Sequence, residues 1–527
     1  MDKRELLLGD EAVALAALHA GISGAYAYPG TPSTELFEFI ERKQEEYGVH
    51  ALWSANEKVA YEEALGMSYA GKRVIVSMKH VGLNVAADPF MNSGVTGVNG
   101  GMVVCVADDP GMHSSQNEQD SRFFAKFCLI PCLEPATQQE AYDMTHRAFE
   151  LSERFGLPIM LRLVTRLAHS RSDVATLTGR SQNPINKVPR GGQFTLLPSN
   201  ARVQYERLTR VQTELQAESE KSPCNELVLG SGKSSLGVIT SGIAHNYFME
   251  AVGGEPPMPY LQVGQYPIPA AKVRDLVDSV DEILVIEEGY PLIEEALGGL
   301  VGVSGKKVRG KLDGSLPRTG ELDPAIVAKV MGRQTEQVWK RTIEPLPGRP
   351  PALCPGCPHT DTFKALNEAV AGYEQPTITS DIGCYTLGFY PPLNAIETCV
   401  DMGASISMAS GAAHAGLWPV LCALGDSTFA HSGMTGLLGA AREDVDMTVM
   451  ILDNGTVAMT GTQKTLATGE ELERIVTGLG VDPGHLRVIT PLSRHHDENV
   501  AIIKEEIEHR GLSVIIARRA CIQIKKR

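Results

Sequence analysis

The stretch Trp418–Gln463, WPVLCALGDSTFAHSGMTGLLGAAREDVDMTVMILDNGTVAMTGTQ, contains the strongest indication of the fold. Two apolar runs, 420–424 and 447–452, each end in a polar turn, Gly-Asp-Ser and Asp-Asn-Gly respectively. Small residues typical of a helix lie between them at 433–442. The pattern predicts a strand, a loop, a helix and a second strand of an open parallel sheet. In such sheets ligands bind at the carboxyl ends of the strands.

These two turns carry residues suited to a metal-bound diphosphate. Asp426 and Asn454 would follow neighbouring strands and converge, and their oxygens, with one from Thr456, are hard ligands of the kind that Mg²⁺ prefers. Gly425 and Ser427 precede a helix whose free N–H groups favour an anion. Taken alone, Asp426 or Asn454 could equally belong to an ordinary turn. The combination of Gly-Asp-Ser with a later Asp-Asn favours a site for a metal and a diphosphate.

Composition limits the class of protein. The 527 residues suffice for three domains of ordinary size, and 43% hydrophobic residues suffice for a large core. A net charge of −15 argues against nucleic acid or an anionic membrane surface as a partner. No apolar run of about 18 residues and no signal-peptide core occur, so we expect a cytoplasmic protein without membrane insertion. Ten cysteines do not indicate a disulfide scaffold here; clustered cysteines indicate metal or redox ligands.

The rest of the chain alternates helical patterns with apolar strands, which predicts α/β domains. Runs at 73–77, 102–107 and 158–164 are predicted strands, and 136–155 is a predicted helix. A second α/β block contains the strand LGVITSG, the helix IAHNYFMEAVGG and the strand ILVIEEG. The predicted parts are a first domain at 1–178, a Gly-, Pro- and Ser-rich linker with a charged helical piece at 179–234, the second block at 235–335, a Pro-rich connector at 336–353 and a third domain at 354–527.

The stretch 418–463 resembles the diphosphate-binding domain of thiamine diphosphate enzymes. In that class a Glu from a separate pyrimidine domain bonds to the aminopyrimidine ring, and the matching candidate is Glu57 in SANEKVA, at the start of a helix of small residues. A first-turn Glu favoured by the helix dipole is the alternative. The diphosphate motif downstream favours the catalytic interpretation.

Four cysteines form a second candidate site. CPGCPH holds Cys354 and Cys357, Cys384 ends SDIGC, and Cys521 lies near the end of the sequence. A CxxC pair alone could be a redox pair, a zinc half-site or neither, and lone cysteines could be core residues. Four thiolates are what a cubane cluster requires. Their order resembles the 2-oxoacid:ferredoxin oxidoreductases, which implies one 4Fe-4S cluster held by these four residues. The resemblance also assigns His359 to the cofactor. The remaining six cysteines are predicted core residues: Cys105, Cys128, Cys132, Cys224, Cys399 and Cys422.

Essentially the whole chain resembles the large subunits of the indolepyruvate:ferredoxin oxidoreductases. The matching stretches are AYAYPGTPSTE, NEKVAYEEALGMSYAG, VSMKHVGLNVAADP, ADDPGMHSSQNEQDSR, LVIEEGYPLIEE, CPGCPH, DIGCYTLG, GDSTFAHSG and LDNGTVAMTG. The resemblance implies the thiamin-diphosphate-binding fold, with doubly wound pyrimidine and diphosphate domains and an intervening transketolase C-terminal-like domain. The family's large subunit commonly ends in a ferredoxin-like domain with CxxCxxCxxxCP runs, which this sequence does not contain. We therefore expect later electron-transfer clusters to be absent or carried by another subunit.

A 2-oxoacid carboxylate needs cationic or N–H donors. The turn at Thr31 and the segment 113–122 resemble the family's substrate side, which makes Thr31 and Arg122 candidate substrate contacts, with Arg122 as a carboxylate clamp. A surface Arg that ends a polar loop is the alternative. His80, after a predicted strand, could move protons or be a structural imidazole.

The resemblance implies a thiamine diphosphate- and Mg²⁺-dependent oxidation of a 2-oxoacid, indolepyruvate or a related aryl pyruvate, with coenzyme A to an acyl-CoA and CO₂. Electrons would pass through the cluster to ferredoxin or to another iron–sulfur or flavin carrier. A small β/γ-type subunit in an α2β2 assembly is the expected partner. A non-oxidative thiamine decarboxylase or carboligase, and a non-catalytic subunit that keeps the fold, are the alternatives.

Overall fold

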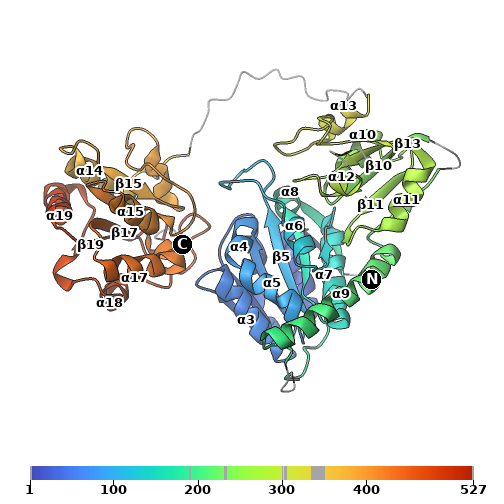
Figure 1. Ribbon diagram of the computed structural model, residues 1–527, viewed down its shortest axis with the longest axis horizontal. Helices are drawn as coiled ribbons and strands as arrows, with labels where there is room; N and C mark the ends of the chain where they lie inside the picture. The colour runs from blue at the N-terminus through green and yellow to red at the C-terminus, as the bar shows by residue number, and fades with distance from the viewer. Residues whose placement is uncertain are drawn as a thin grey trace. The chain divides into compact units, whose positions relative to one another are not determined.

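The computed structural model describes residues 3–188, 192–230, 234–298, 301, 305–333 and 351–524. The chain divides into two compact units, Met1–Lys340 and Arg341–Arg527 (Figure 1). Most of the predicted connector at 336–353 lies outside the described residues.

A seven-stranded sheet forms the centre of the first unit. Its order is β12 (Gln265–Tyr266), β6 (Cys132–Leu133), β7 (Ile159–Val164), β5 (Met102–Asp108), β4 (Val74–Lys79), β2 (Gly24–Ala27) and β3 (His50–Trp53). All pairs are parallel except β12 with β6. One face packs on α1 (Gly9–His19), α2 (Thr34–Tyr47) and α7 (Gln138–Phe155), and the other on α3 (Glu57–Tyr69) and α5 (Ala87–Thr96). Because both faces are covered, the central strands are predominantly apolar. The predicted doubly wound sheet is confirmed.

A second, five-stranded sheet belongs to the same unit. Its order is β14 (Lys307–Arg309), β13 (Val280–Ile286), β10 (Ser234–Ser241), β11 (Tyr260–Val263) and β9 (Leu227–Val228), with only β9 antiparallel. Helices α10 (Ala244–Val252), α11 (Ala270–Ser279) and α13 (Pro324–Val330) accompany it. This sheet begins at Leu227, before the predicted boundary at 235. Strand β12 follows β11 in the chain but pairs with β6 of the seven-stranded sheet, so the chain passes directly from the second sheet into the first.

The predicted linker contains a 24-residue helix, α9 (Pro198–Lys221). Leu208 and Leu215 are its buried apolar residues, and it packs against α5 and α11. Gln212 Nε2 donates to the Leu129 carbonyl at 3.1 Å and Gln216 Nε2 to the Ile268 carbonyl at 2.9 Å. The helix therefore ties both sheets of the unit together. Two buried leucines, two helical turns apart, were too sparse a pattern to indicate that role.

Three further elements close the first unit. Strand β1 (Lys3–Leu8) pairs antiparallel with β8 (Arg171–Thr176), and the short helix α8 (Thr165–His169) joins β7 to β8. This arrangement brings the start of α1 against the end of α8. A Cβ at Gly9 would lie 2.2 Å from the Leu167 carbonyl oxygen, so only glycine allows this contact.

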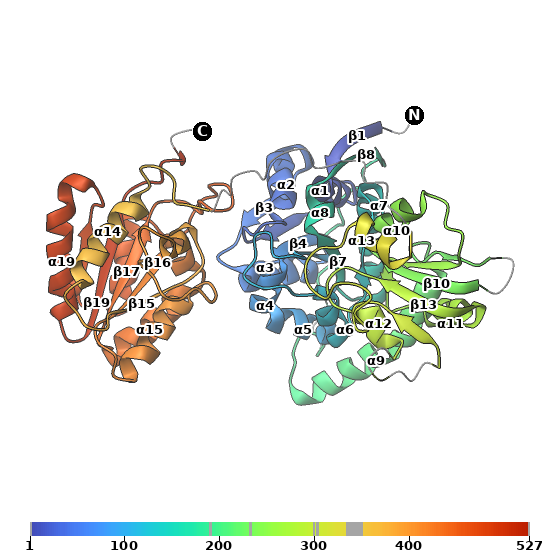
Figure 2. The ribbon, with the colours of Figure 1, turned by 90° about the horizontal axis from the view of Figure 1, so that it is seen from above.

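The second unit is a parallel sheet in the order β15 (Thr377–Ser380), β16 (Val420–Gly425), β17 (Met447–Asp453), β19 (Leu512–Arg518) and β18 (Leu486–Ile489). Figure 2 shows α14 (Pro358–Val370) and α19 (His496–Glu508) on one side of it and α15 (Ala404–His414) on the other. Helix α17 (Met434–Glu443) lies between β16 and β17 in the chain and packs on α15. The strand–loop–helix–strand unit predicted from 418–463 is confirmed. Among the described residues, no helix is both long and apolar enough to cross a membrane.

Candidate cofactor and substrate sites

Asp426 and Asn454 follow adjacent strands and meet at the carboxyl edge of the second unit's sheet. Asp426 is 1% exposed. Its Oδ2 accepts a hydrogen bond from the Gly455 N–H at 2.8 Å, and its Oδ1 accepts from the Ser427 N–H at 2.7 Å. Burial, and then Asp453, raise the pKa of Asp426 to about 7. The structure thus brings the two predicted turns together and buries a carboxylate between them.

Asn454 links this edge to His359 and Thr456. Its Nδ2 lies 3.3 Å from His359 Nε2, and its Oδ1 accepts from the Thr456 N–H at 3.0 Å. Burial lowers the pKa of His359 to about 4, so the imidazole is neutral and can accept this bond. The Thr456 hydroxyl donates to the Gln463 carbonyl at 2.8 Å. Carboxylate and amide oxygens at one sheet edge fit a hard cation such as Mg²⁺.

Asp453, the neighbouring acid, has a structural environment. Its Oδ2 accepts from the Gly469 N–H at 2.9 Å and from Arg518 Nε at 2.8 Å. Its Oδ1 accepts from the Thr468 hydroxyl at 2.6 Å. These bonds fix the loop that leads into α18 (Gly469–Gly478). Of the two acids in this region, Asp426 is the one suited to a metal.

The structure brings the four predicted cluster cysteines together beside Asn454. The Cys521 N–H donates to the Asn454 carbonyl at 2.9 Å, and the Cys357 N–H to the Cys354 carbonyl at 3.0 Å. Burial raises the pKa of Cys384 to about 12, and the nearby thiols of Cys357, Cys521 and Cys354 contribute. Four neighbouring thiols that influence one another electrostatically fit a cluster ligand set. The other six cysteines divide into four buried ones (Cys105, Cys128, Cys132 and Cys422), the half-buried Cys224, and Cys399, which is exposed and not a core residue.

Glu57 begins α3 directly after β3, as the sequence predicts. It is 6% exposed, and the Asn56 side chain caps the helix by accepting from the Val59 N–H at 2.9 Å. A Cβ at Gly82 would lie 2.6 Å from Glu57 Oε1. Gly82 belongs to α4 (His80–Val85), the helix that follows β4. The absence of a side chain at Gly82 therefore makes room for the Glu57 carboxylate.

Thr31, Lys79 and Asp109 gather at the carboxyl edge of the first sheet. The Ser114 hydroxyl donates to the Thr31 carbonyl at 3.3 Å, and Lys79 Nζ donates to the Ser114 carbonyl at 2.7 Å. Asp109 Oδ2 accepts from the Ser114 N–H at 2.8 Å. Burial lowers the pKa of Lys79 to about 8, and Asp109 opposes that shift. Sequence reasoning did not single out Lys79, although its position at the end of an apolar run places it at this edge.

Arg122 does not have the environment of a substrate clamp. It is 1% exposed, and its guanidinium pairs with Asp120 at 2.5 Å and Glu287 at 3.0 Å. It also donates to the Tyr266 hydroxyl at 3.1 Å and to the Glu288 carbonyl at 3.0 Å. With its donors engaged by protein groups on both sheets of the first unit, Arg122 stabilises the contact between them. The prediction that it binds the substrate carboxylate is not supported by this geometry.

His80 is buried, which favours a structural imidazole over a proton-transfer group. It is 1% exposed, and its Nε2 lies 3.2 Å from the Asn117 carbonyl.

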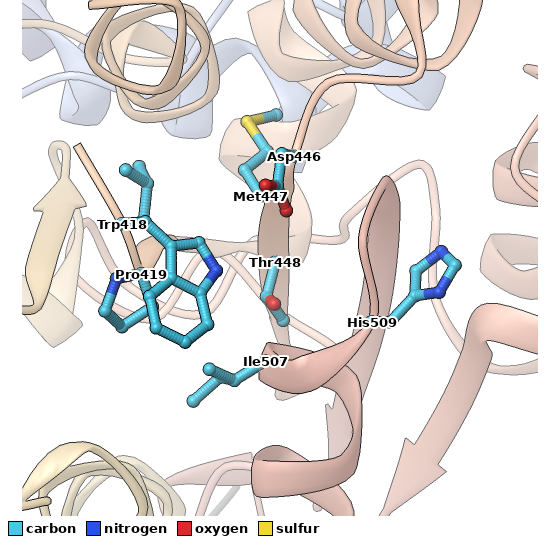
Figure 3. A pocket seen from close by; sticks show the side chains of 8 residues that line it. Trp418, Pro419, Asp446, Met447, Thr448, Ile507 and His509 are labelled. Carbon is cyan, nitrogen blue, oxygen red and sulfur yellow. The ribbon is translucent and has the colours of Figure 1, made fainter. Parts of the chain in front are cut away.

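A shallow pocket of the second unit lies at the opposite edge of its sheet from Asp426 (Figure 3). Trp418 and Pro419 precede β16, Asp446 precedes β17 and His509 precedes β19, so the pocket is at the amino ends of these strands. Parallel sheets bind ligands at the other edge. This pocket is therefore not part of the candidate cofactor site.

Two family models match the chain. The model described as pyruvate flavodoxin/ferredoxin oxidoreductase, thiamine diP-bdg, matches residues 15–224. The model described as thiamine pyrophosphate enzyme, C-terminal TPP binding domain, matches residues 381–517. Together with the parallel sheets and the candidate ligand residues at their edges, these matches define a thiamine diphosphate-dependent 2-oxoacid:ferredoxin oxidoreductase.

The chain resembles curated proteins over nearly its full length. It is 37% identical to the indolepyruvate oxidoreductase subunit IorA of Methanothermobacter thermautotrophicus, over 98% of this chain and 86% of that protein. It is 36% identical to the IorA subunit of Pyrococcus abyssi, with the same two coverages. The chain therefore belongs to the IorA subunit family of the indolepyruvate oxidoreductases, and the resemblance seen in its motifs is confirmed.

A solved structure supports the fold. The 2-oxoglutarate:ferredoxin oxidoreductase from Magnetococcus marinus aligns with a TM-score of 0.51 at 15% identity, covering 63% of this chain and 65% of that one.

Proposed function

We propose that this chain is the catalytic subunit of an oxidoreductase that acts on indolepyruvate or a related aryl pyruvate. The reaction is oxidative decarboxylation with coenzyme A, giving an acyl-CoA and CO₂. Electrons pass through one 4Fe-4S cluster to ferredoxin or to another low-potential carrier. The names of the IorA relatives support the substrate class.

One observation carries the oxidative reaction over its non-oxidative alternative. The backbone N–H of Cys521, a proposed cluster ligand, donates to the carbonyl of Asn454, a proposed metal ligand, at 2.9 Å. Cys354, Cys357 and Cys384 contribute the other thiols. A decarboxylase without redox chemistry has no need of four thiols beside its diphosphate site. A short electron path from cofactor to cluster requires this proximity.

The donor set fits Mg²⁺ and thiamine diphosphate. Asp426, Asn454 and Thr456 would supply oxygens to the metal, and Gly425, Ser427 and His359 would lie along the diphosphate. Thiamine diphosphate, when bound, supplies carbanion chemistry at the keto carbon of the substrate. Glu57 would hold and return a proton at the aminopyrimidine ring, because a carboxyl group can act as both acid and base.

On the substrate side we assign the carboxylate contact to Thr31 and Lys79 in place of Arg122. Lys79 carries an ammonium group beside the Thr31 turn, whereas the Arg122 guanidinium is already surrounded by protein acids. A cation at this edge would orient the substrate carboxylate through a charge-assisted hydrogen bond.

The family also suggests the partners. A small β/γ-type subunit would complete an α2β2 assembly and contribute to the coenzyme A and acceptor side. Ferredoxin, or another iron–sulfur or flavin protein, would accept the electrons.

The test is anaerobic turnover with the partner subunit present. A panel of 2-oxoacids is offered with coenzyme A and a viologen dye, and aryl pyruvates should give the fastest dye reduction. The chain should contain about four irons. Cys384→Ser should lose iron and dye reduction, whereas Cys422→Ser, a change at a buried core thiol, should keep both. Aldehyde release without dye reduction would show the non-oxidative alternative, and cofactor binding without turnover would show a non-catalytic subunit.

A further inference from the structure

Three ligand-type side chains meet in the first unit away from the sites described above. Asp10 lies in the first turn of α1, Glu35 in the first turn of α2 and His169 in the last turn of α8. One oxygen or nitrogen from each lies within 4.8 Å of the others. Because α1 is pressed against α8 at Gly9, Asp10 and His169 are held together by rigid elements.

The buried carboxylate of this group lacks hydrogen-bond donors. Asp10 is 0% exposed, and within the described part of the chain neither of its carboxylate oxygens has a hydrogen-bond partner. Glu35 Oε2 instead faces His169 Nε2, and this pairing lowers the pKa of Glu35 and raises the pKa of His169. Burial, and then the Glu35 carboxylate, raise the pKa of Asp10 well above its usual range. The backbone N–H of Leu36 opposes this shift, although its geometry does not meet that of a hydrogen bond. Buried carboxylates are normally paired or bound to a metal.

The spacing is close to that of a coordinated ion. Glu35 Oε2 lies 3.4 Å from His169 Nε2. Two ligands of one ion, each bonded at about 2.1 Å, are at most about 4.2 Å apart, so small side-chain shifts would close the set. The side chains of His169 and Glu35 are 33% and 40% exposed, which leaves one side open to water.

We propose that Asp10, Glu35 and His169 bind a divalent cation, with water completing its coordination. One imidazole and two carboxylates suit Mn²⁺ or Zn²⁺ better than Mg²⁺, which prefers oxygen ligands alone. The cation would supply the positive charge that the unpaired oxygens of Asp10 lack. It would be distinct from the ion proposed at Asp426, which lies in the other unit of the chain.

The cation would also position a proposed substrate contact, a consequence that rests on the proposed function. Glu35 follows the Thr31 turn by one helical turn, so a metal bond to Glu35 would anchor the start of α2 and the turn before it. These three residues would act as positioning residues and would not touch the substrate.

The test is a Mn²⁺ titration of the anaerobic full chain, without thiamine diphosphate, followed by electron paramagnetic resonance. Mn²⁺ is chosen because it disfavours thiolates. The wild type should bind one Mn²⁺ ion at this site. The Asp10→Asn and His169→Ala variants should bind it with an affinity at least about tenfold lower. Two matched control variants should keep the wild-type Mn²⁺ affinity. Glu45→Gln removes an exposed charge from α2, and Asp426→Ala removes the proposed metal ligand of the other unit.

A second readout separates a bound metal from a change in folding. Electron spin echo modulation should show a ¹⁴N coupling from the His169 imidazole in the wild type and in Glu45→Gln, and none in His169→Ala. Circular dichroism checks that each variant is folded. If His169→Ala unfolds, the Mn²⁺ affinity of the nearly isosteric Asp10→Asn variant tests the site instead. Equal Mn²⁺ affinity in wild type and Asp10→Asn, or absence of the ¹⁴N coupling, would overturn the site and leave a protonated Asp10 beside a Glu35–His169 ion pair. Such a result would leave the proposed function intact, because dye reduction is measured separately.

Discussion

The carboxyl edges of the two large parallel sheets hold sites of different construction. In the second unit, Asp426 and Asn454 directly follow adjacent strands, so the ends of the strands place them together. In the first unit, Lys79 ends a strand, whereas Arg122 follows a long loop that turns inward and buries its charge. Chemistry at a strand end can be identified from sequence, because the sheet determines where it lies. The direction in which a cationic side chain points after a long loop cannot be identified from the sequence.

The largest expected effect is at Glu57. Glu57→Gln should lower kcat by about 10³-fold, because an amide cannot exchange the proton that general acid–base catalysis requires. Thiamine diphosphate affinity, measured by calorimetry, should be unchanged. Glu62→Gln, an exposed change on the same helix, is the control. Activity within a few fold of wild type in Glu57→Gln would assign the role to another carboxylate.

Asp426 and Asp453 provide the next contrast, between a metal ligand and a structural acid. Asp426→Ala should weaken Mg²⁺-dependent thiamine diphosphate binding about 100-fold, because one hard ligand of the set is lost. Asp453→Asn should instead lower the free energy of unfolding by about 2 kcal/mol, because its charged hydrogen bonds to Arg518 and Gly469 are weakened. Calorimetric titration and denaturant unfolding of both variants distinguish the roles. Retained cofactor affinity in Asp426→Ala would falsify the metal assignment.

Lys79→Met should raise KM for the 2-oxoacid about tenfold, since one charge-assisted hydrogen bond is lost. The pH dependence follows from burial, which lowers the pKa of Lys79 to about 8, with Asp109 facing it. Above pH 8 the ammonium loses its proton and its attraction for an anion, so kcat/KM should fall. Lys79→Arg, charged at every pH tested, should remove that fall. An unchanged alkaline limb in Lys79→Arg would exclude Lys79 as its source.

The smallest expected effect on catalysis is at Arg122. Arg122→Met should lower the free energy of unfolding by about 3–5 kcal/mol, because buried acids lose their partner. KM of the folded fraction should stay unchanged. Arg154→Met, where the side chain is 60% exposed, should alter neither quantity. A stable Arg122→Met protein with a raised KM would restore Arg122 as the substrate clamp and reverse the comparison with Lys79.

Much of this architecture could be predicted from local patterns. The strands β4, β5, β7, β16 and β17 are predominantly apolar because helices cover both faces of their sheets, although β7 also carries the buried Arg162. Helix α9 was harder to recognise as an integral part of the first unit, because its polar residues bond to distant backbone carbonyls, as Gln216 does to Ile268. Strand β12 is two residues long, and its pairing with β6 has no sequence pattern.

The sequence alone shows where strands end and which oxygens and thiols stand there, because turn chemistry and apolar runs are properties of neighbouring residues. It therefore indicates Asp426, Asn454 and the CPGC pair directly. Folding brings Cys521 against the Asn454 carbonyl, surrounds Arg122 with acids from two sheets and leaves Asp10 buried beside Glu35 and His169. Whether a charged group is open, paired or buried depends on contacts between residues far apart in the chain, and for that reason these three features became visible only in the folded molecule.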